Sequence, residues 1–161
     1  MIRFGSEIQV VPVLAPVDTA GNALGTAFVN ISKAHWITFH LSFGVITDDT
    51  LAVKPEVSIQ NADSGTEADV KFRYRLSGAV GSDSWGAITD VAAGSTITVA
   101  GTADGASYLI DVDPADVTNA LANADNVRLL ITPGASSTVC LLGAVAFLEP
   151  RYPALNQQSS S

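Results

Sequence analysis

The side chains that could carry out chemistry are few and scattered. His35 and His40 are the two histidines of the chain, and Cys140 is its single cysteine. The two imidazoles lie five residues apart in a stretch with the pattern of a β-strand, so they point to opposite faces and cannot bind one metal ion together. Cys140 lies in an apolar run, which favours a buried and unreactive thiol. We therefore expect no catalytic residue, no metal site and no cofactor.

The acidic residues do not have the spacing of a known site either. Asp48 and Asp49 form a pair that is typical of a turn, and no calcium-binding loop pattern is present. The segment 101–105 has the glycine spacing of a hairpin turn and lacks the lysine of a phosphate-binding loop. No Gly-x-Ser-x-Gly motif supports a serine nucleophile. The sequence therefore predicts a protein that is not an enzyme.

Charge and hydropathy exclude two classes of partner. The 161 residues carry a formal net charge of −8 and only 15% of them are charged. Nucleic-acid binding needs clustered Lys and Arg, so we expect no nucleic-acid partner. No run of about 18 apolar residues occurs, so we expect no membrane partner. A single cysteine excludes an internal disulfide and fits synthesis in a reducing cytoplasm.

The stretch 35–43 organises the rest of the chain. Its apolar side chains alternate with mostly polar ones, which predicts a β-strand that is packed on one face and runs through the middle of a sheet. Its inward positions are Ile37, Phe39, Leu41 and Phe43. Turn residues separate this stretch from seven further predicted strands. They lie at 26–31, 55–60, 69–76, 95–99, 107–112, 127–132 and 139–148.

Two of these strands carry further predictions. In 69–76 the residues Val70, Phe72, Tyr74 and Leu76 are expected to face the core, and Lys71, Arg73 and Arg75 to face outward. The outward cations fit either a solvated sheet face or a face that pairs with an acidic neighbour. The strand 139–148 is apolar on both faces, so both are expected to be covered, one by the core and the other by a helix or another subunit.

One helix is predicted after residue 112. Asp113 is a suitable N-cap, Pro114 suits the first helical position and Asp116 places an acid in the first turn. The apolar residues that follow suggest about three turns, with Asn126 closing the helix.

The predicted fold class is all-β. We expect a jelly-roll-like, two-sheet antiparallel β-sandwich of about eight strands, with one short helix and an extended N-terminal arm. Residues 1–25 form the arm or an edge strand, because Pro12 and Pro16 cannot donate ladder hydrogen bonds. Residues 26–149 form the sandwich, and residues 150–161 form a C-terminal tail.

Several segments together resemble small virion proteins of tailed bacteriophages. These segments are the N-terminal arm, 36–39 (Trp-Ile-Thr-Phe), 72–75 (Phe-Arg-Tyr-Arg) with the Trp85 loop behind it, and 147–152 (Phe-Leu-Glu-Pro-Arg-Tyr). The family is that of capsid decoration, or cement, proteins, which sit on the outer shell and clamp capsomers.

This resemblance implies a non-enzymatic structural protein that is made in the bacterial cytoplasm and is located on the capsid surface of the virion. Its expected partners are the major capsid protein and other copies of itself, as a trimer rather than a dimer. Residues 1–14 are the expected capsid-binding arm, with the tail from Pro150 as the second choice, and a chain without residues 1–14 should fold but not bind. The expected interface residues are Ile8, Val10, Val11, Val13, Leu14, Leu142, Ala144, Ala146, Arg151 and Tyr152.

Three other interpretations stay open. A carbohydrate-binding jelly-roll module of a phage fibre or tail would use exposed aromatic residues, for which Trp36, Tyr74, Trp85, Tyr108 and Tyr152 are the candidates. A cupin-type enzyme would need clustered His and Glu ligands, which two separated histidines supply poorly. A plain subunit of a tail or baseplate has no feature that separates it from a capsid protein.

Overall fold

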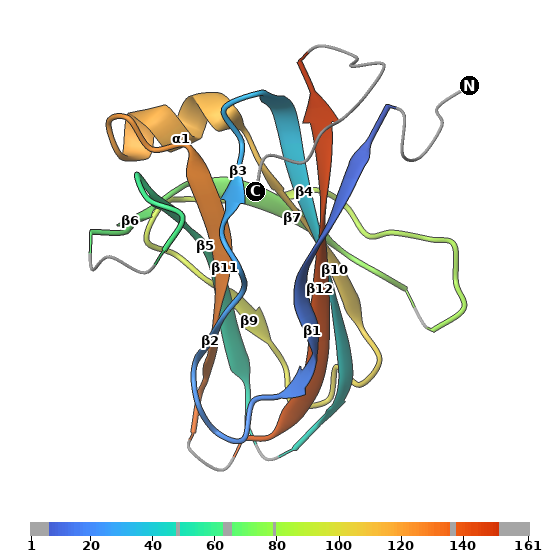
Figure 1. The fold of residues 1–161 in the computed structure, drawn as a ribbon. Coiled ribbons are helices and arrows are strands. Elements are labelled where there is room, and N and C mark those ends of the chain that lie inside the picture. Colours follow the sequence, from blue (N-terminus) through green and yellow to red (C-terminus); the bar gives the residue numbers. More distant parts are fainter. Residues whose placement is uncertain (1–6, 48, 63–65, 79, 136–137, 152–161) are drawn as a thin grey trace.

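The chain folds into two antiparallel sheets that pack face to face, with one helix at one end (Figure 1). This computed structural model describes residues 7–47, 49–62, 66–78, 80–135 and 138–151. The predicted all-β two-sheet sandwich with a single short helix is confirmed. The described residues form twelve strands rather than about eight, because five of the strands have only two or three residues.

The larger sheet is built around the predicted central strand. Its β4 lies between β12 and β10, and β1 and β8 form the two edges. In order across the sheet, the six strands are β1 (Gln9–Asp18), β12 (Cys140–Pro150), β4 (Ala34–Ile46), β10 (Ser107–Val112), β7 (Phe72–Leu76) and β8 (Thr89–Val91). Most neighbours in this sheet are distant in sequence, as Greek-key connections require.

The smaller sheet is centred on β11 and β5, which pair along their full lengths from Asn126↔Ser58 to Pro133↔Leu51. Short strands complete it on both sides. The six strands are β2 (Leu24–Gly25), β3 (Val29–Asn30), β11 (Asn126–Pro133), β5 (Leu51–Ser58), β6 (Ala68–Asp69) and β9 (Ile97–Val99).

The outer face of the smaller sheet carries a charge network. The Nε and Nη2 atoms of Arg128 donate to Oε2 of Glu56 at 3.2 and 3.0 Å. The ammonium of Lys54 lies 3.3 Å from the other Glu56 oxygen and donates to Asp69 at 2.6 Å. The hydrogen bond to Asp69 is the main cause that raises the pKa of Lys54 above its ordinary value. The guanidinium of Arg128 also lies over the Phe28 ring, 4.7 Å from its centroid.

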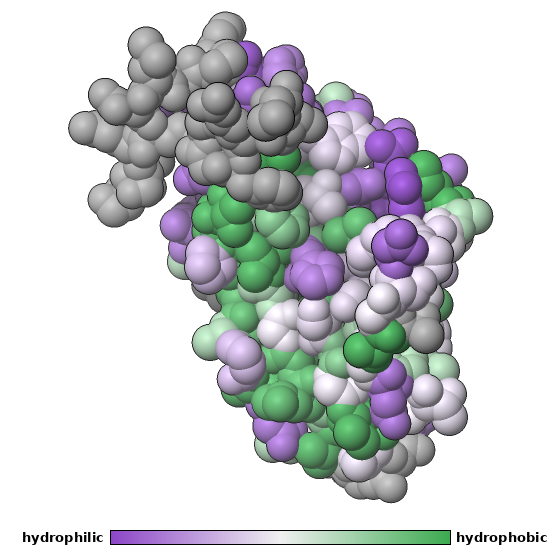
Figure 2. All heavy atoms as spheres, turned by 90° about the vertical axis from the view of Figure 1, so that its right-hand side faces the viewer, coloured by the Kyte–Doolittle hydropathy of each residue, from purple (hydrophilic) through white to green (hydrophobic). Residues whose placement is uncertain are grey.

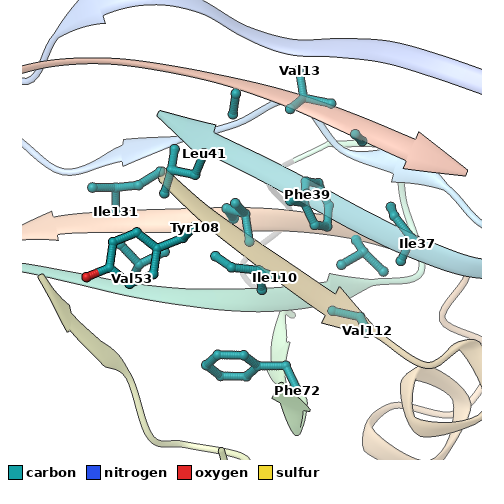
Figure 3. Close-up of a cluster of buried hydrophobic side chains, with 14 of the residues drawn as sticks. Val13, Ile37, Phe39, Leu41, Val53, Phe72, Tyr108, Ile110, Val112 and Ile131 are labelled. Atoms are coloured by element: carbon teal, nitrogen blue, oxygen red, sulfur yellow. The ribbon is translucent and has the colours of Figure 1, made fainter. Parts of the chain in front are cut away.

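The hydrophobic core lies between the two sheets (Figure 3). Ile37, Phe39 and Leu41 of β4 are fully buried, as the alternation of this strand predicts. Ile110 of β10 lies beside them, and Ile131 of β11 belongs to the smaller sheet. Removing this much apolar surface from water is the main source of the stability of such a fold.

The helix α1 (Pro114–Ala120) joins β10 to β11. The Asp113 carboxylate accepts a hydrogen bond from the Ala115 amide at 2.9 Å, so the predicted N-cap is in place. The predicted length is wrong, because the chain is already extended at Leu121. Asn126 does not close the helix, since it is the first residue of β11.

The prediction for strand 69–76 is correct at one end and wrong at the other. Val70 and Phe72 are buried in the core, and Tyr74 is packed against it. Leu76, however, is exposed, because it is the last residue of β7 and the chain leaves the sheet there. Lys71 and Arg73 face outward, where they pair with acidic residues of this same chain.

Strand β12 alternates in burial although it is apolar on both faces. Its core positions are Cys140, Leu142, Ala144, Ala146 and Leu148. Leu141, on the opposite face, is 54% exposed. The helix does not cover this second face, because α1 lies at the end of the sandwich (Figure 1).

Residues 9–18 form an edge strand rather than a free arm. They pair with β12 from Gln9↔Leu148 to Asp18↔Leu141, with irregularities on both sides of Leu14. Val13 reaches the core and is buried. Residues 1–6 and 152–161, where the remaining arm and tail are expected, lie outside the described residues.

Candidate functional site

The first candidate surface is the outer face of the larger sheet. Strand register aligns its side chains into rows that cross the sheet. One row contains Val10, Phe147, Thr38, Asp111 and Arg73, and the next contains Pro12, Val145, His40, Leu109 and Arg75. In these two rows the β1 and β12 positions are apolar, and the β10 and β7 positions are polar except for Leu109. Figure 2 looks onto this side of the molecule and shows hydrophobic and hydrophilic residues mixed across it.

The polar side is held together by contacts within the sheet. Thr38 donates a hydrogen bond to one Asp111 oxygen at 2.6 Å, and Nε of Arg73 lies 3.4 Å from the other. The Arg73 guanidinium also lies over the Trp36 ring, 4.6 Å from its centroid. These contacts fix the orientation of Arg73 and Asp111, which suits a structural role for both residues.

The segment after β7 folds back over this face. Gly78 donates its amide to Ser84 at 3.0 Å and Gly86 donates to Leu76 at 2.8 Å, which closes a hairpin. Trp85 then meets the His40 ring edge-on, with the ring centroids 6.5 Å apart. Desolvation by burial lowers the pKa of His40 below its ordinary value, which favours the neutral imidazole.

A cavity of about 270 Å³ opens on the apolar side of the face. Its apolar walls are Trp36 of β4, Phe147 of β12 and Ile8, which directly precedes β1. The acidic residues Glu7 and Glu149 and the polar residue Thr38 also line it. A second hollow, of about 520 Å³ and more polar, lies beside the start of α1 and is lined by His35, Asp113 and Arg151.

The fold does not bring together the side chains that could act as catalysts or metal ligands. His35 lies at the hollow beside α1, and His40 lies under Trp85. Cys140 is buried, and desolvation raises the pKa of its thiol to about 11, so the thiol stays protonated at neutral pH. Within the described part of the chain, no three His, Cys, Asp or Glu side chains are grouped to hold a metal ion. The seven residues of α1, the one helix in the described ranges, are too few to cross a membrane.

The expected interface residues occupy quite different places. Leu142, Ala144, Ala146 and Val13 lie in the core, so a partner cannot reach their side chains while the sandwich is folded. Val11 and Leu14 are partly buried against the core. Ile8 lines the cavity, and Val10 is 44% exposed. Arg151 bonds to the backbone of Ala34 at 3.0 Å, and Tyr152 lies outside the described residues.

Sequence reasoning missed the side chains that do face outward from β12, above all Val145 and Phe147. They occupy alternate positions to the residues that were expected at the interface. Because β12 is apolar at both sets of positions, its own pattern gives no signal for which set faces the core. The register with Thr38 and His40 of β4 would have given it, since those polar residues face outward.

Comparisons with known proteins add no relative: no family-wide sequence pattern, no curated protein and no solved structure matches this chain.

Proposed function

We propose that this chain is a non-enzymatic structural protein that binds a neighbouring protein surface through the outer face of its larger sheet. The observation that supports this function is the apolar half of that face. Val10, Pro12, Val145 and Phe147 lie side by side there, and α1 does not cover them. Apolar side chains grouped on an otherwise polar surface are a mark of interaction sites.

The particular role that we propose is decoration of a phage capsid, with the major capsid protein as partner. Its support is the resemblance of the four segments named above to phage cement proteins, together with a β-sandwich whose larger sheet has six strands. A stable interface takes about 800 Å² from each partner, and about 25 cal/mol is gained per Å² of apolar surface buried before association costs are met. A six-stranded sheet can offer a face of that size.

The position of β1 changes which part of the chain we expect to bind the capsid. Val13 is a core residue and β1 pairs with β12, so removing residues 1–14 should unfold part of the larger sheet. Loss of binding by such a truncated chain would therefore not identify an arm. Single substitutions on the outer face test the proposal more cleanly.

The test is co-sedimentation of the purified chain with phage capsids assembled without it. The V10E variant places a charge on the apolar face, and I59E is its matched control beside the smaller sheet. Val10 and Ile59 are almost equally exposed, at 44% and 46%. We expect wild type and I59E to bind and V10E to bind at least tenfold more weakly. Failure of wild type to bind capsids, or equal binding by V10E, would refute the proposal.

Self-association is part of the same proposal, as a trimer rather than a dimer. Light scattering of wild type and V10E measures it directly. A trimeric wild type whose mass falls on V10E substitution would place the subunit contact on the larger sheet. A wild type that is monomeric at every concentration would remove self-association and leave the capsid as the only partner.

The carbohydrate-binding alternative loses much of its support. Tyr108 is buried and Tyr74 is packed against the core, so neither can stack on a sugar ring. Arg73 already lies over the Trp36 ring, and Trp85 is 38% exposed, so Trp85 is the better candidate of the two tryptophans. Binding of the chain to a glycan array that a W85A substitution abolishes would restore this alternative.

A further inference from the structure

The cavity beside Trp36 has the size of a single side chain. Its volume is about 270 Å³, which is below the range of roughly 300–1,000 Å³ that is typical of pockets for drug-sized ligands. It opens on the outer face of the larger sheet, within the apolar half that the proposed function assigns to a protein partner. One residue of that partner could therefore enter it as an anchor, as buried anchors do at many interfaces.

The lining of the cavity combines aromatic walls with negative charge. Trp36, Phe147 and Ile8 supply apolar surface, and the two acidic residues Glu7 and Glu149 belong to the same lining. An apolar side chain would fill the volume, but it has no group that could pair with an acidic residue of the lining. An arginine meets both requirements, because its methylene stem is apolar and its guanidinium pairs with carboxylates.

The same chain already binds guanidinium groups in this way at two other places. Arg73 lies 4.6 Å from the Trp36 centroid and 3.4 Å from an Asp111 oxygen. Arg128 lies 4.7 Å from the Phe28 centroid and 3.0 Å from a Glu56 oxygen. Each combines one aromatic ring with one carboxylate, and cation–π contacts of this kind favour Arg.

The order of strands leaves the other side of Trp36 available. Arg73 comes from β7 and approaches Trp36 across β10, whereas the cavity is lined by β12 and by Ile8, which directly precedes β1. Because β12 and β10 flank β4 on opposite sides, Trp36 stands between Arg73 and the cavity. The net charge of −8 also draws a cationic group towards the surface.

We infer that this cavity receives an arginine side chain of the partner protein. The inference rests on the proposed function for its biological partner, but its chemistry can be tested without capsids. The test compares the blocked peptide Ac-Gly-Arg-Gly-amide with the same peptide carrying citrulline, the neutral isostere of arginine. The protein is the W85F variant, in which Trp36 is the single tryptophan and reports on the cavity by its fluorescence.

We expect the arginine peptide to change Trp36 emission saturably, with at least tenfold weaker binding of the citrulline peptide. Adding E149Q should weaken binding of the arginine peptide at least fivefold. D83N, which removes an exposed carboxylate from the hairpin after β7, is the matched charge control and should change it less than twofold. Equal binding of the two peptides, or equal losses in E149Q and D83N, would overturn the inference.

The competing occupant is Arg3 of the chain itself, which precedes Glu7 by four residues. An R3A substitution that tightens binding of the arginine peptide tenfold or more would assign the cavity to the chain's own arginine and overturn the inference. Unchanged binding in R3A supports it. If capsid binding holds and depends on Val10 while the peptides fail, the proposed function survives and the arginine anchor alone is wrong.

Discussion

Replacing Glu56 by glutamine should be among the most damaging conservative changes on the outer face of the smaller sheet. Glu56 accepts two hydrogen bonds from Arg128 and pairs with Lys54 through its second oxygen. The side chains of Glu56 and Arg128 are only 11% and 12% exposed. The E56Q variant keeps the volume and removes the charge, so two cations lose a partner that water replaces only in part.

The size of the effect follows from burial. Removing one partner of a buried ion pair costs about 3–5 kcal/mol, because the other charge is left uncompensated. Lys54 keeps its 2.6 Å bond to Asp69, and glutamine can still accept one bond from Arg128. We therefore expect E56Q to lower the free energy of unfolding by about 2–4 kcal/mol. R128M leaves Glu56 with Lys54 alone and also loses the contact with Phe28, which is worth about 0.5–1 kcal/mol.

The assay is urea unfolding of wild type, E56Q, R128M and the double variant at pH 7. If the pair acts as a unit, the double variant should lose about 1–3 kcal/mol less than the sum of the single losses. The Lys71–Asp116 pair is the control, because Lys71 is 64% exposed and D116N should cost no more than about 1 kcal/mol. A loss below about 0.5 kcal/mol in E56Q, or additive losses in the double variant, would refute the reasoning.

Three further outcomes are expected. The pKa of the Cys140 thiol rises from 9.0 to about 11 on folding, so the unfolded chain loses this proton first and the free energy of unfolding should fall as pH rises from about 9 to 11. In urea titrations over this pH range, the free energy of unfolding of C140A should fall less steeply than that of wild type. Equal slopes would contradict the burial argument. V13A should cost about 2 kcal/mol by the same method, from two lost methyl groups and the cavity left behind, whereas V10A on the exposed side of β1 should cost less than about 0.5 kcal/mol. D113A removes the N-cap of the seven-residue helix and should cost about 1 kcal/mol, with loss of helical signal by circular dichroism; no change would show that packing alone holds α1.

The parts of the fold that the sequence predicts best are those with a strong local signal. The alternation from Ile37 to Phe43 identifies both the central strand and its buried face. The predicted strand 107–112 has the bounds of β10, since turn residues flank it on one side and a helix cap on the other. Strands of two or three residues, such as β2 and β8, are not predictable in this way, because so few residues show no periodicity.

The candidate site depends on contacts that no local pattern contains. The sequence does not show which alternate set of β12 side chains faces the core, because Leu142 and Leu141 are equally apolar. Only the pairing of β12 with β4 and β1 decides which of the two is buried. The cavity joins Ile8 to Phe147, which are 139 residues apart in the sequence. Trp85 reaches His40 only because the hairpin after β7 turns back across β10. Such juxtapositions come from topology, so they need the folded chain.

The pairing of β1 with β12 has a consequence during synthesis. Val10 pairs with Phe147, which the ribosome adds 137 residues later. At 5–20 residues per second, a ribosome needs about 7–27 s to make that length of chain. For this time β1 is an apolar segment without its proper neighbour, at risk of pairing with nascent chains nearby. Pro12 and Pro16 lack amide donors, so foreign strands find an incomplete ladder there. The two prolines thus disfavour pairing of β1 with foreign strands until β12 has been synthesised.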